Sequence, residues 1–433
     1  MQVSASTVAV LGLLLFVVLM MLKLPVSFSL FIAGFAGILY LSPSPEAAFN
    51  MLASNVWGQM ASYAFSVIPF YIFMGEIVFR TGISQTIFDA AYKWVGRFRG
   101  GLASTTILAS AGFASISGST SATAATIGTI ALPELRKYKY SETLSTGSIA
   151  AGGTLGTIIP PSTVLIVIAL LTQQSIGELF VASVIPGLLL AVLMIGVIAY
   201  LIWRHPDYGP PSEQRFTFKE KIVSTLAVFP IFLLFAFVIG GLFFGWFTPT
   251  ESGAFGAFGA LVITWAMRRL TWERFKTAVV STLKTSAMIM MLIISAVIFG
   301  KFLTMTRLSF VLVDFINGLN VSPLVILLIV IIIFVIGGAI MDAMGFLMIA
   351  VPIFFPVITN LGYDPVWFGV LVCVLTSMGA ITPPIGLNVF VVKGLSPTTP
   401  LTTVFKGANY FLAAYAVFIA LCIMFPQIIT FVL

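Results

Sequence analysis

Apolar stretches of around 20 residues recur from one end of the chain to the other, separated by short polar segments. A helix of this length spans a hydrocarbon layer about 30 Å thick. Only 8% of the residues are charged, compared with about 25% in a typical soluble domain. The sequence therefore predicts an all-α polytopic membrane protein. Its first apolar segment lacks the basic flank and small-residue cleavage site of a signal peptide, so we expect a membrane span there.

The residue types that most enzymes need are scarce. The single histidine, His205, lies in a polar loop, away from any partner for a zinc site or a nucleophile–histidine pair. Cys373 and Cys422 stand alone in apolar segments, as small buried residues do. No GxxxxGK[ST] loop is present. We therefore expect no enzyme, no organic cofactor and no ATP hydrolysis. A hydrolase using Ser119 or Ser121 would lack a base.

The basic residues indicate how the chain crosses the membrane. The net charge is +7, but all 21 Lys and Arg residues except Lys301 and Arg307 fall in segments that one orientation places in the cytoplasm. The excess of positive charge therefore reflects topology and not nucleic-acid binding. This orientation predicts an N-terminus outside the cytoplasm, spans over about 7–22, 26–42 and 63–80, and an external segment at 43–62. Both termini then lie outside the cytoplasm.

The stretch 102–133 has basic clusters on both flanks, and a single crossing would place one cluster outside. We therefore expect a re-entrant hairpin that enters and leaves on the cytoplasmic side. Two short full spans are the alternative, which the high Gly, Ser and Thr content disfavours.

The second half of the sequence repeats the first at an offset of 223. The segment GTIIPP, which ends in Pro160-Pro161, matches GAITPP, which ends in Pro383-Pro384. Pro133 falls on Pro356 at the same offset. Each half provides about five spans and one hairpin, so the second half starts in the cytoplasm and is inverted. Inverted repeats with interrupted helices are typical of secondary transporters.

The first predicted hairpin carries a run of hydroxyl side chains, SAGFASISGSTSATAATIGTIALP, over 110–133. Irregular backbone at its tip would offer N–H groups to an anionic substrate, and carbonyl and hydroxyl oxygens to Na⁺. The alternative is a small-residue face that only packs helices. The substrate-binding candidates, which include two polar residues after the helix breaks, are Ser117, Gly118, Ser119, Thr120, Ser121, Thr163 and Asn388.

Asp342 is the only charged residue of the second predicted hairpin, and it falls opposite Ser119 at the offset of 223. A carboxylate at membrane depth is a functional candidate, with a structural hairpin cap as the alternative. The paired prolines free backbone carbonyls one turn earlier. The Na⁺-ligand candidates are Ser119, Gly156, Pro160, Asp342, Gly379 and Thr382. We interpret Glu76, four residues before Arg80, as half of a helix-end ion pair.

With these residues identified, the chain resembles the large membrane subunit of a tripartite ATP-independent periplasmic (TRAP) transporter. The resemblance covers essentially the whole chain and is carried by SGSTSATAATIGTIALP, GGTLGTIIPPS, GGAIMDAMGF and GAITPPIGLNVF. It implies a bacterial or archaeal cytoplasmic membrane, Na⁺ coupling and an elevator mechanism. It also implies a small four-span membrane subunit and a soluble periplasmic binding protein that delivers an organic acid, such as a C4-dicarboxylate or a sialic acid.

The resemblance also implies a division of the chain into four regions. A mobile transport domain would comprise 100–203, with hairpin 102–133 and broken helix 142–172, and 308–433, with hairpin 323–360 and broken helix 365–395. A scaffold would comprise 1–99, with an external arm at 43–62, and 204–307, with a cytoplasmic arm at 268–285.

Two other classes of membrane protein remain as alternatives. A stand-alone Na⁺/divalent-anion symporter would share the inverted repeat and work without a binding protein. A non-transporting scaffold would not require Asp342 or the matched helix breaks.

Overall fold

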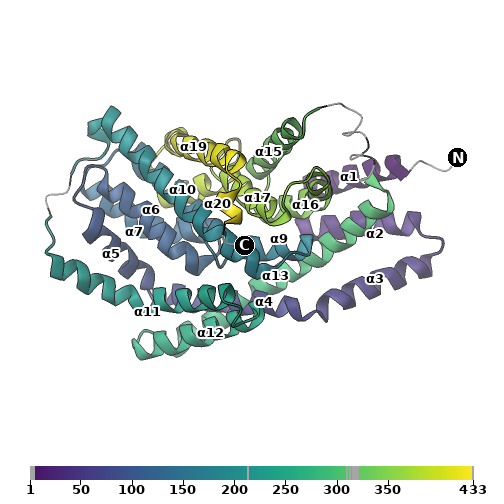
Figure 1. Cartoon of the computed structure of the whole chain (residues 1–433), viewed down its shortest axis with the longest axis horizontal. Helices are drawn as coiled ribbons and strands as arrows, with labels where there is room; N and C mark the ends of the chain where they lie inside the picture. Colours follow the sequence, from purple (N-terminus) through teal and green to yellow (C-terminus); the bar gives the residue numbers. More distant parts are fainter. Residues whose placement is uncertain (1–4, 212–213, 309–310, 312–313, 315–320, 432–433) are drawn as a thin grey trace.

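The computed structural model describes residues 5–211, 214–308, 311, 314 and 321–431, and these residues form helices with no strand among them (Figure 1). The helices of the first half are α1 (Ala5–Met21), α2 (Val26–Leu41), α3 (Pro45–Met60), α4 (Val67–Arg80), α5 (Ile83–Val95), α6 (Gly101–Ser117), α7 (Thr120–Lys137), α8 (Glu142–Ile158), α9 (Thr163–Thr172) and α10 (Ile176–Arg204). Those of the second half are α11 (Phe218–Phe243), α12 (Pro249–Ala266), α13 (Trp272–Met305), α15 (Pro323–Ile340), α16 (Ala343–Asn360), α17 (Pro365–Gly379), α18 (Leu387–Leu395), α19 (Leu401–Met424) and α20 (Gln427–Thr430).

The helix starts confirm the internal repeat. Helices α2 and α12 begin at Val26 and Pro249, and α7 and α16 begin at Thr120 and Ala343, both pairs at the offset of 223. Even the N-caps correspond. The side chain of Ser119 caps α7 by accepting from the Ala122 N–H, and the side chain of Asp342 caps α16 by accepting from the Met344 N–H. The predicted fold class, two all-helical membrane repeats, is therefore confirmed.

Each half contains a helical hairpin followed by an interrupted helix. Helices α6 and α7 meet at Gly118, whose φ of 58° lies in the left-handed region that glycine adopts freely. Helices α8 and α9 are bent by 42° at their break. Each hairpin tip packs on the break of its own half, because the Thr163 hydroxyl donates to the Gly118 carbonyl (2.8 Å) and the Ile385 N–H donates to the Ala339 carbonyl (3.2 Å).

Among the described residues, seven helices are long and apolar enough to cross a membrane, and the bent pair α8–α9 brings the total to eight. Helices α1, α2 and α17 are apolar but shorter. The hairpin helices α15 and α16 each pass this test of length and composition. The contact of their tip with the break after α17 is therefore what identifies them as a hairpin matching α6–α7.

The two segments expected as arms differ in structure. The first, at 43–62, contains the separate helix α3, which a short turn at 61–62 and the 3-10 helix Tyr63–Ser66 connect to α4. The second, at 268–285, is not a separate element. Its residues from Trp272 onward form the start of α13, a single helix of 34 residues that continues to Met305. Residues 1–4 of the region 1–99, and most of 309–320 in the region 308–433, lie outside the described residues.

In the middle of the molecule the helices α2, α4, α12 and α13 of the predicted scaffold pack together, and the two halves of the predicted transport domain meet. Helix α13 packs on α2 so closely that a Cβ on Gly34 would lie 2.8 Å from the Cα of Phe299. Elsewhere α8 contacts α17, where the hydroxyls of Thr157 and Ser377 are 2.6 Å apart. This packing places both hairpin tips beside α2, α4 and α13.

Candidate functional site

The tip of the first hairpin is a network of hydroxyl groups. The Ser117 hydroxyl hydrogen-bonds to the Thr123 hydroxyl, and its oxygen lies 3.3 Å from the Ser119 carbonyl oxygen. The hydroxyls of Ser119 and Ser121 are 3.4 Å apart, and the Thr123 hydroxyl donates to the Ser119 carbonyl (2.8 Å). Because a hydroxyl both donates and accepts, this network can bind an anion through O–H groups or a cation through oxygen lone pairs.

Residues on both sides of the break between α8 and α9 contact this tip. Gly156 packs directly on it, since a Cβ at this position would lie 2.3 Å from the Ser119 carbonyl oxygen and 2.5 Å from the Thr123 hydroxyl. Only glycine allows this approach. The Thr163 hydroxyl, at the start of α9, holds the Gly118 carbonyl. Gly156 and Thr163, one on each side of the break, therefore hold the tip in position.

Asp342 occupies the corresponding place at the tip of the second hairpin. One of its carboxylate oxygens accepts from the Met344 N–H at 3.1 Å, and the side chain is exposed. The structural cap considered as an alternative is therefore present. The capping bond uses one lone pair of a carboxylate that has about four acceptor sites, so most of its acceptor capacity remains open.

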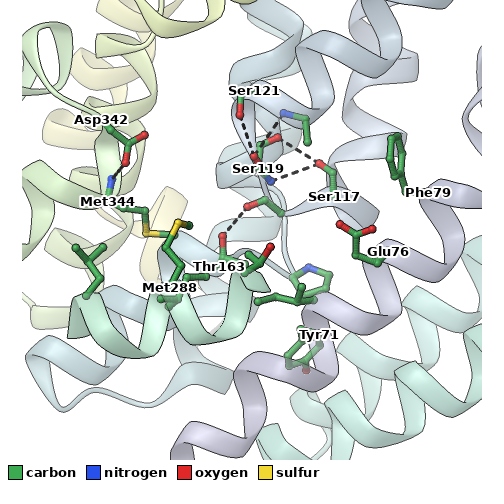
Figure 2. Close-up of a pocket in the computed structure, with 18 of the residues that line it drawn as sticks. Tyr71, Glu76, Phe79, Ser117, Ser119, Ser121, Thr163, Met288, Asp342 and Met344 are labelled. Carbon is green, nitrogen blue, oxygen red and sulfur yellow. Dashed lines mark hydrogen bonds between the residues drawn. The ribbon is translucent and has the colours of Figure 1, made fainter. Parts of the chain in front are cut away.

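One cavity of about 490 Å³ connects the two tips (Figure 2). The tips contribute Ser117, Gly118, Ser119, Ser121 and Asp342, and the first break contributes Pro161 and Thr163. The opposite wall comes from α2, α4 and α13 and includes Val26, Tyr71, Glu76, Phe79 and Met288. In Figure 2 the serines of the first tip lie between Asp342 on one side and Glu76 on the other.

Six of the predicted site residues line this cavity: Ser117, Gly118, Ser119, Ser121, Thr163 and Asp342. The other predicted residues, which do not line it, are Thr120, Gly156, Pro160, Gly379, Thr382 and Asn388. Of these, Gly156 still contacts the tip as described above. Thr120 is buried in the first turn of α7.

The second helix break contributes no residue to the cavity, contrary to the symmetry expected from the repeat. Gly379 packs on the backbone of Gly338, where a Cβ would lie 2.3 Å from the Gly338 carbonyl carbon. The Thr382 hydroxyl, in the break after α17, donates to the Met378 carbonyl in the last turn of that helix (2.7 Å). Asn388 is fully buried and donates its amide N–H to the Ala150 carbonyl (3.1 Å), which joins α18 to α8.

The residues that sequence reasoning missed lie on the wall opposite the tips. Glu76 forms the predicted ion pair, with 2.8 Å between its Oε2 and the Arg80 Nε, but it also lines the cavity. Its charge inside an otherwise apolar span was the available signal. Tyr71, Phe79 and Met288 carry no such signal, because apolar and aromatic residues are common in any membrane helix.

Within the described residues, no group of three or more His, Cys, Asp or Glu side chains could hold a metal ion. A cation at the tips would therefore be coordinated by the Asp342 carboxylate together with hydroxyl and carbonyl oxygens. Oxygen ligands of this kind suit a hard cation. This donor set is compatible with Na⁺.

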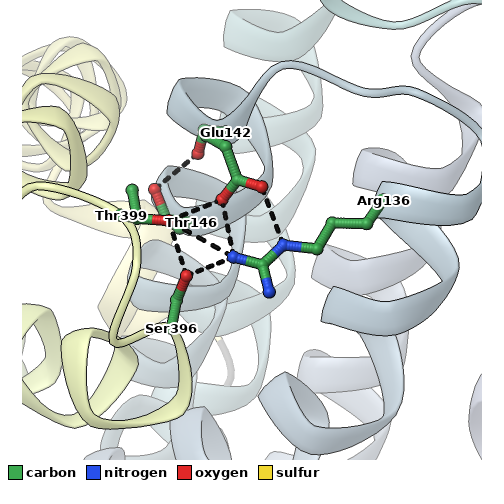
Figure 3. A network of polar contacts seen from close by, with 5 residues as sticks. All are labelled: Arg136, Glu142, Thr146, Ser396 and Thr399. Carbon is green, nitrogen blue, oxygen red and sulfur yellow. Dashed lines mark hydrogen bonds and ion pairs between the residues drawn. The ribbon is translucent and has the colours of Figure 1, made fainter.

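A second polar cluster lies at the end of the first hairpin and joins the two halves of the chain (Figure 3). Arg136 binds Glu142 through two hydrogen bonds of 2.7 and 3.0 Å, and it also donates to Ser396 and Thr399. The Thr399 hydroxyl donates to Glu142 at 2.7 Å. This Arg136 cluster ties α7 and α8 to the loop after α18. At the offset of 223 the ion pair has no counterpart, because Thr359 and Pro365 occupy those positions.

Comparisons with known proteins agree with this architecture. Residues 13–428 match the family model "Tripartite ATP-independent periplasmic transporter, DctM component". The chain is 33% identical to the C4-dicarboxylate TRAP transporter large permease protein DctM of Pseudomonas aeruginosa, with 92% of each chain covered. It is 30% identical to the sialic acid TRAP transporter large permease protein SiaM of Vibrio cholerae, with 93% of each covered.

A solved structure shares the fold. The chain resembles the YdaH transporter of Alcanivorax borkumensis, whose crystal structure is described as having an unusual topology. The TM-score is 0.60, the sequence identity is 16%, and the match covers 89% of this chain and 90% of that one.

Proposed function

Because the chain belongs to the DctM-component family of tripartite ATP-independent periplasmic transporters, we propose that it carries out Na⁺-coupled uptake of an organic acid delivered by a periplasmic binding protein. A small four-span membrane subunit would complete the membrane complex, and lipid would surround it in the bacterial inner membrane. Both termini would face the periplasm. The substrate class follows from the names of the relatives, which include carriers of C4-dicarboxylates and sialic acid.

The observation that carries this proposal is the single cavity between the two hairpin tips and helices α2, α4 and α13. Its tip side offers hydroxyl groups for a carboxylate, and Asp342 supplies negative charge for a cation. A Na⁺ ion beside Asp342 would lower the electrostatic cost of bringing an organic anion into the same cavity. Binding of the two ligands is then mutually favourable, which is what symport requires.

The same cavity supports an elevator mechanism. One wall consists of the hairpins and the first broken helix, which belong to the proposed transport domain, and the other wall belongs to the proposed scaffold. Movement of the hairpins along α2, α4 and α13 would carry the bound acid across the membrane. The aromatic and aliphatic side chains on the scaffold wall suit a sliding contact, because they make few directional bonds.

The test is uptake into proteoliposomes that contain the chain with its small membrane subunit and its binding protein. Labelled succinate and N-acetylneuraminate are the probes, and an inward Na⁺ gradient is compared with a K⁺ gradient at equal ionic strength. We expect uptake of one acid only when Na⁺ and the binding protein are both present. Uptake without the binding protein would identify a stand-alone symporter, and uptake of neither acid would contradict the proposed substrate class.

A further inference from the structure

Glu76 faces the cavity from the proposed scaffold, opposite the serines of the first tip. It is about three-quarters buried, with a side-chain exposure of 23%, and it pairs with Arg80 one helical turn along α4. Arg80 has a similar exposure of 24% but does not line the cavity. The carboxylate of Glu76 therefore faces the cavity, while the guanidinium of Arg80 does not line it.

Two partners hold the Arg80 guanidinium in this position. Its Nε donates to Glu76 at 2.8 Å, and one of its terminal nitrogens donates to the Ser281 hydroxyl on α13 at 2.7 Å. Among the described residues that line the cavity, the charged ones are Glu76 and Asp342. An organic acid in the cavity thus meets no cationic side chain, although a guanidinium lies one turn away.

The position of this guanidinium matters for a moving carrier. A free arginine binds carboxylates by charge-assisted and often bidentate hydrogen bonds. If Arg80 made such bonds to the substrate, the bonds would join the acid to the scaffold and would have to break whenever the hairpins moved. Tight binding of this kind lowers KM without raising kcat.

We propose that Glu76 masks Arg80, so that the scaffold wall does not bind the organic anion and the anion remains with the moving hairpins. This inference rests on the proposed function. Glu76 is then a positioning residue for Arg80 and a determinant of substrate release, while Arg80 balances the charge of a carboxylate that would otherwise repel the substrate.

Three variants separate this role from a structural one, using uptake of whichever probe acid the wild-type complex transports. In Glu76→Gln the unmasked Arg80 binds the acid, and we expect KM and kcat both to fall by about three- to tenfold. In Arg80→Gln the unpaired Glu76 repels the acid, and KM rises by about three- to tenfold. In the double variant Glu76→Gln/Arg80→Gln both charges are absent, and KM and kcat return to within about twofold of wild type.

Glu134→Gln is the matched control, because it removes the carboxylate of an exposed ion pair with Lys137 that does not line the cavity. It should leave KM and kcat unchanged. If the pair is only structural, the double variant will be at least as impaired as either single variant, and the inference is wrong. Wild-type kinetics in all three variants would also contradict it. Failure of the wild-type complex to transport either acid would instead overturn the proposed function, and this inference with it.

Discussion

The clearest difference between the two halves at the residue scale is the exchange of Ser119 for Asp342 at equivalent hairpin tips. Both side chains cap a helix by accepting a hydrogen bond from a backbone N–H, and serine and aspartate do this about equally well. The carboxylate adds a full negative charge beside the cavity, which the serine does not. The charge, and not the cap, is therefore what should matter for Na⁺.

Asp342→Asn tests this assignment. Asparagine caps a helix as well as aspartate does, so the variant should fold, while the loss of charge weakens Na⁺ binding. A ligand at a hundred times its Kd stabilises the folded state by about 2.7 kcal/mol. We expect the wild-type protein to melt at a higher temperature in NaCl than in KCl at equal ionic strength, and this difference to shrink in the variant.

Asp364→Asn is the matched control for this measurement. Asp364 caps α17 by accepting from the Trp367 N–H at 2.8 Å, and it does not line the cavity. Its variant should keep the full difference between NaCl and KCl. If Asp342→Asn keeps it as well, the carboxylate is only a cap.

Gly156→Ala tests whether the break holds the tip. The added Cβ would collide with the Ser119 carbonyl, and overpacking of this kind typically costs about 1–3 kcal/mol. We expect uptake to fall at least about tenfold, because the tip must shift away from its place in the cavity. Gly196→Ala is the control, since a Cβ there meets nothing within 4 Å. Uptake equal to wild type in both variants would show that the tip position is not critical.

At the scale of elements, the Arg136 cluster joins helices of the first half to a loop of the second. Its ion pair is partly exposed, with side-chain exposures of 37% and 39%, which reduces its contribution through solvent screening. The bidentate geometry and the two hydroxyl partners favour a contribution near the upper end for exposed pairs, about 1 kcal/mol.

Arg136→Gln should therefore lower the melting temperature of the purified protein by about 1 °C, because the unfolding entropy of a 433-residue chain is large. The variant removes the charge and the bidentate hydrogen bonds while retaining a polar side chain. Lys137→Gln, which breaks the neighbouring exposed pair with Glu134, should leave the melting temperature unchanged. An equal loss in both variants would mean that the cluster adds nothing beyond surface charge.

Much of the helix order was predictable from the sequence, because membrane spans, paired prolines and the repeat are encoded in local patterns. Hairpin 102–133 and broken helix 142–172 correspond closely to α6–α7 and α8–α9. The continuity of α13 was not predictable, since its polar first turns resemble those of a separate arm and no helix breaker separates them from the span. The scaffold wall of the cavity was also missed, because Tyr71 and Met288 carry no sequence signal.

More of the site residues predicted in the first half line the cavity than of those predicted in the second half. The hydroxyl run over 110–133 contains the tip residues that line the cavity, and Asp342 stands out as a single charge. Gly379 and Thr382, which the symmetry argument also named, do not line the cavity, and their role as Na⁺ ligands stays a prediction. The sequence offset shows which residues of the two repeats are equivalent. It does not show which of two equivalent residues lines the cavity between the repeats.

At the scale of the whole molecule, two aromatic contacts test the proposed division into scaffold and transport domain. The rings of Phe79 on α4 and Phe113 on α6 lie 6.1 Å apart across the proposed sliding interface. The rings of Phe73 on α4 and Phe275 on α13 lie the same distance apart, but both belong to the proposed scaffold.

Cysteine pairs at these positions give opposite expectations. After cross-linking with a bifunctional thiol reagent that reduction can cleave, Phe79→Cys/Phe113→Cys should lose uptake, because α6 can no longer move along α4, and reduction should restore it. Phe73→Cys/Phe275→Cys should keep its uptake when cross-linked. The two native cysteines are buried, which limits competing reactions. Continued uptake by the first pair after complete cross-linking would rule out movement at this interface.

The matched tips also have an evolutionary consequence. A chain with an internal repeat contains the same hairpin backbone twice, and the side chains of the two copies can differ. Here one copy has a serine at the capping position and the other an aspartate, on helices that begin at equivalent residues. Under the proposed function, the hydroxyl side chains of one tip can change, and with them the acid that is bound, while the carboxylate of the other tip stays as it is.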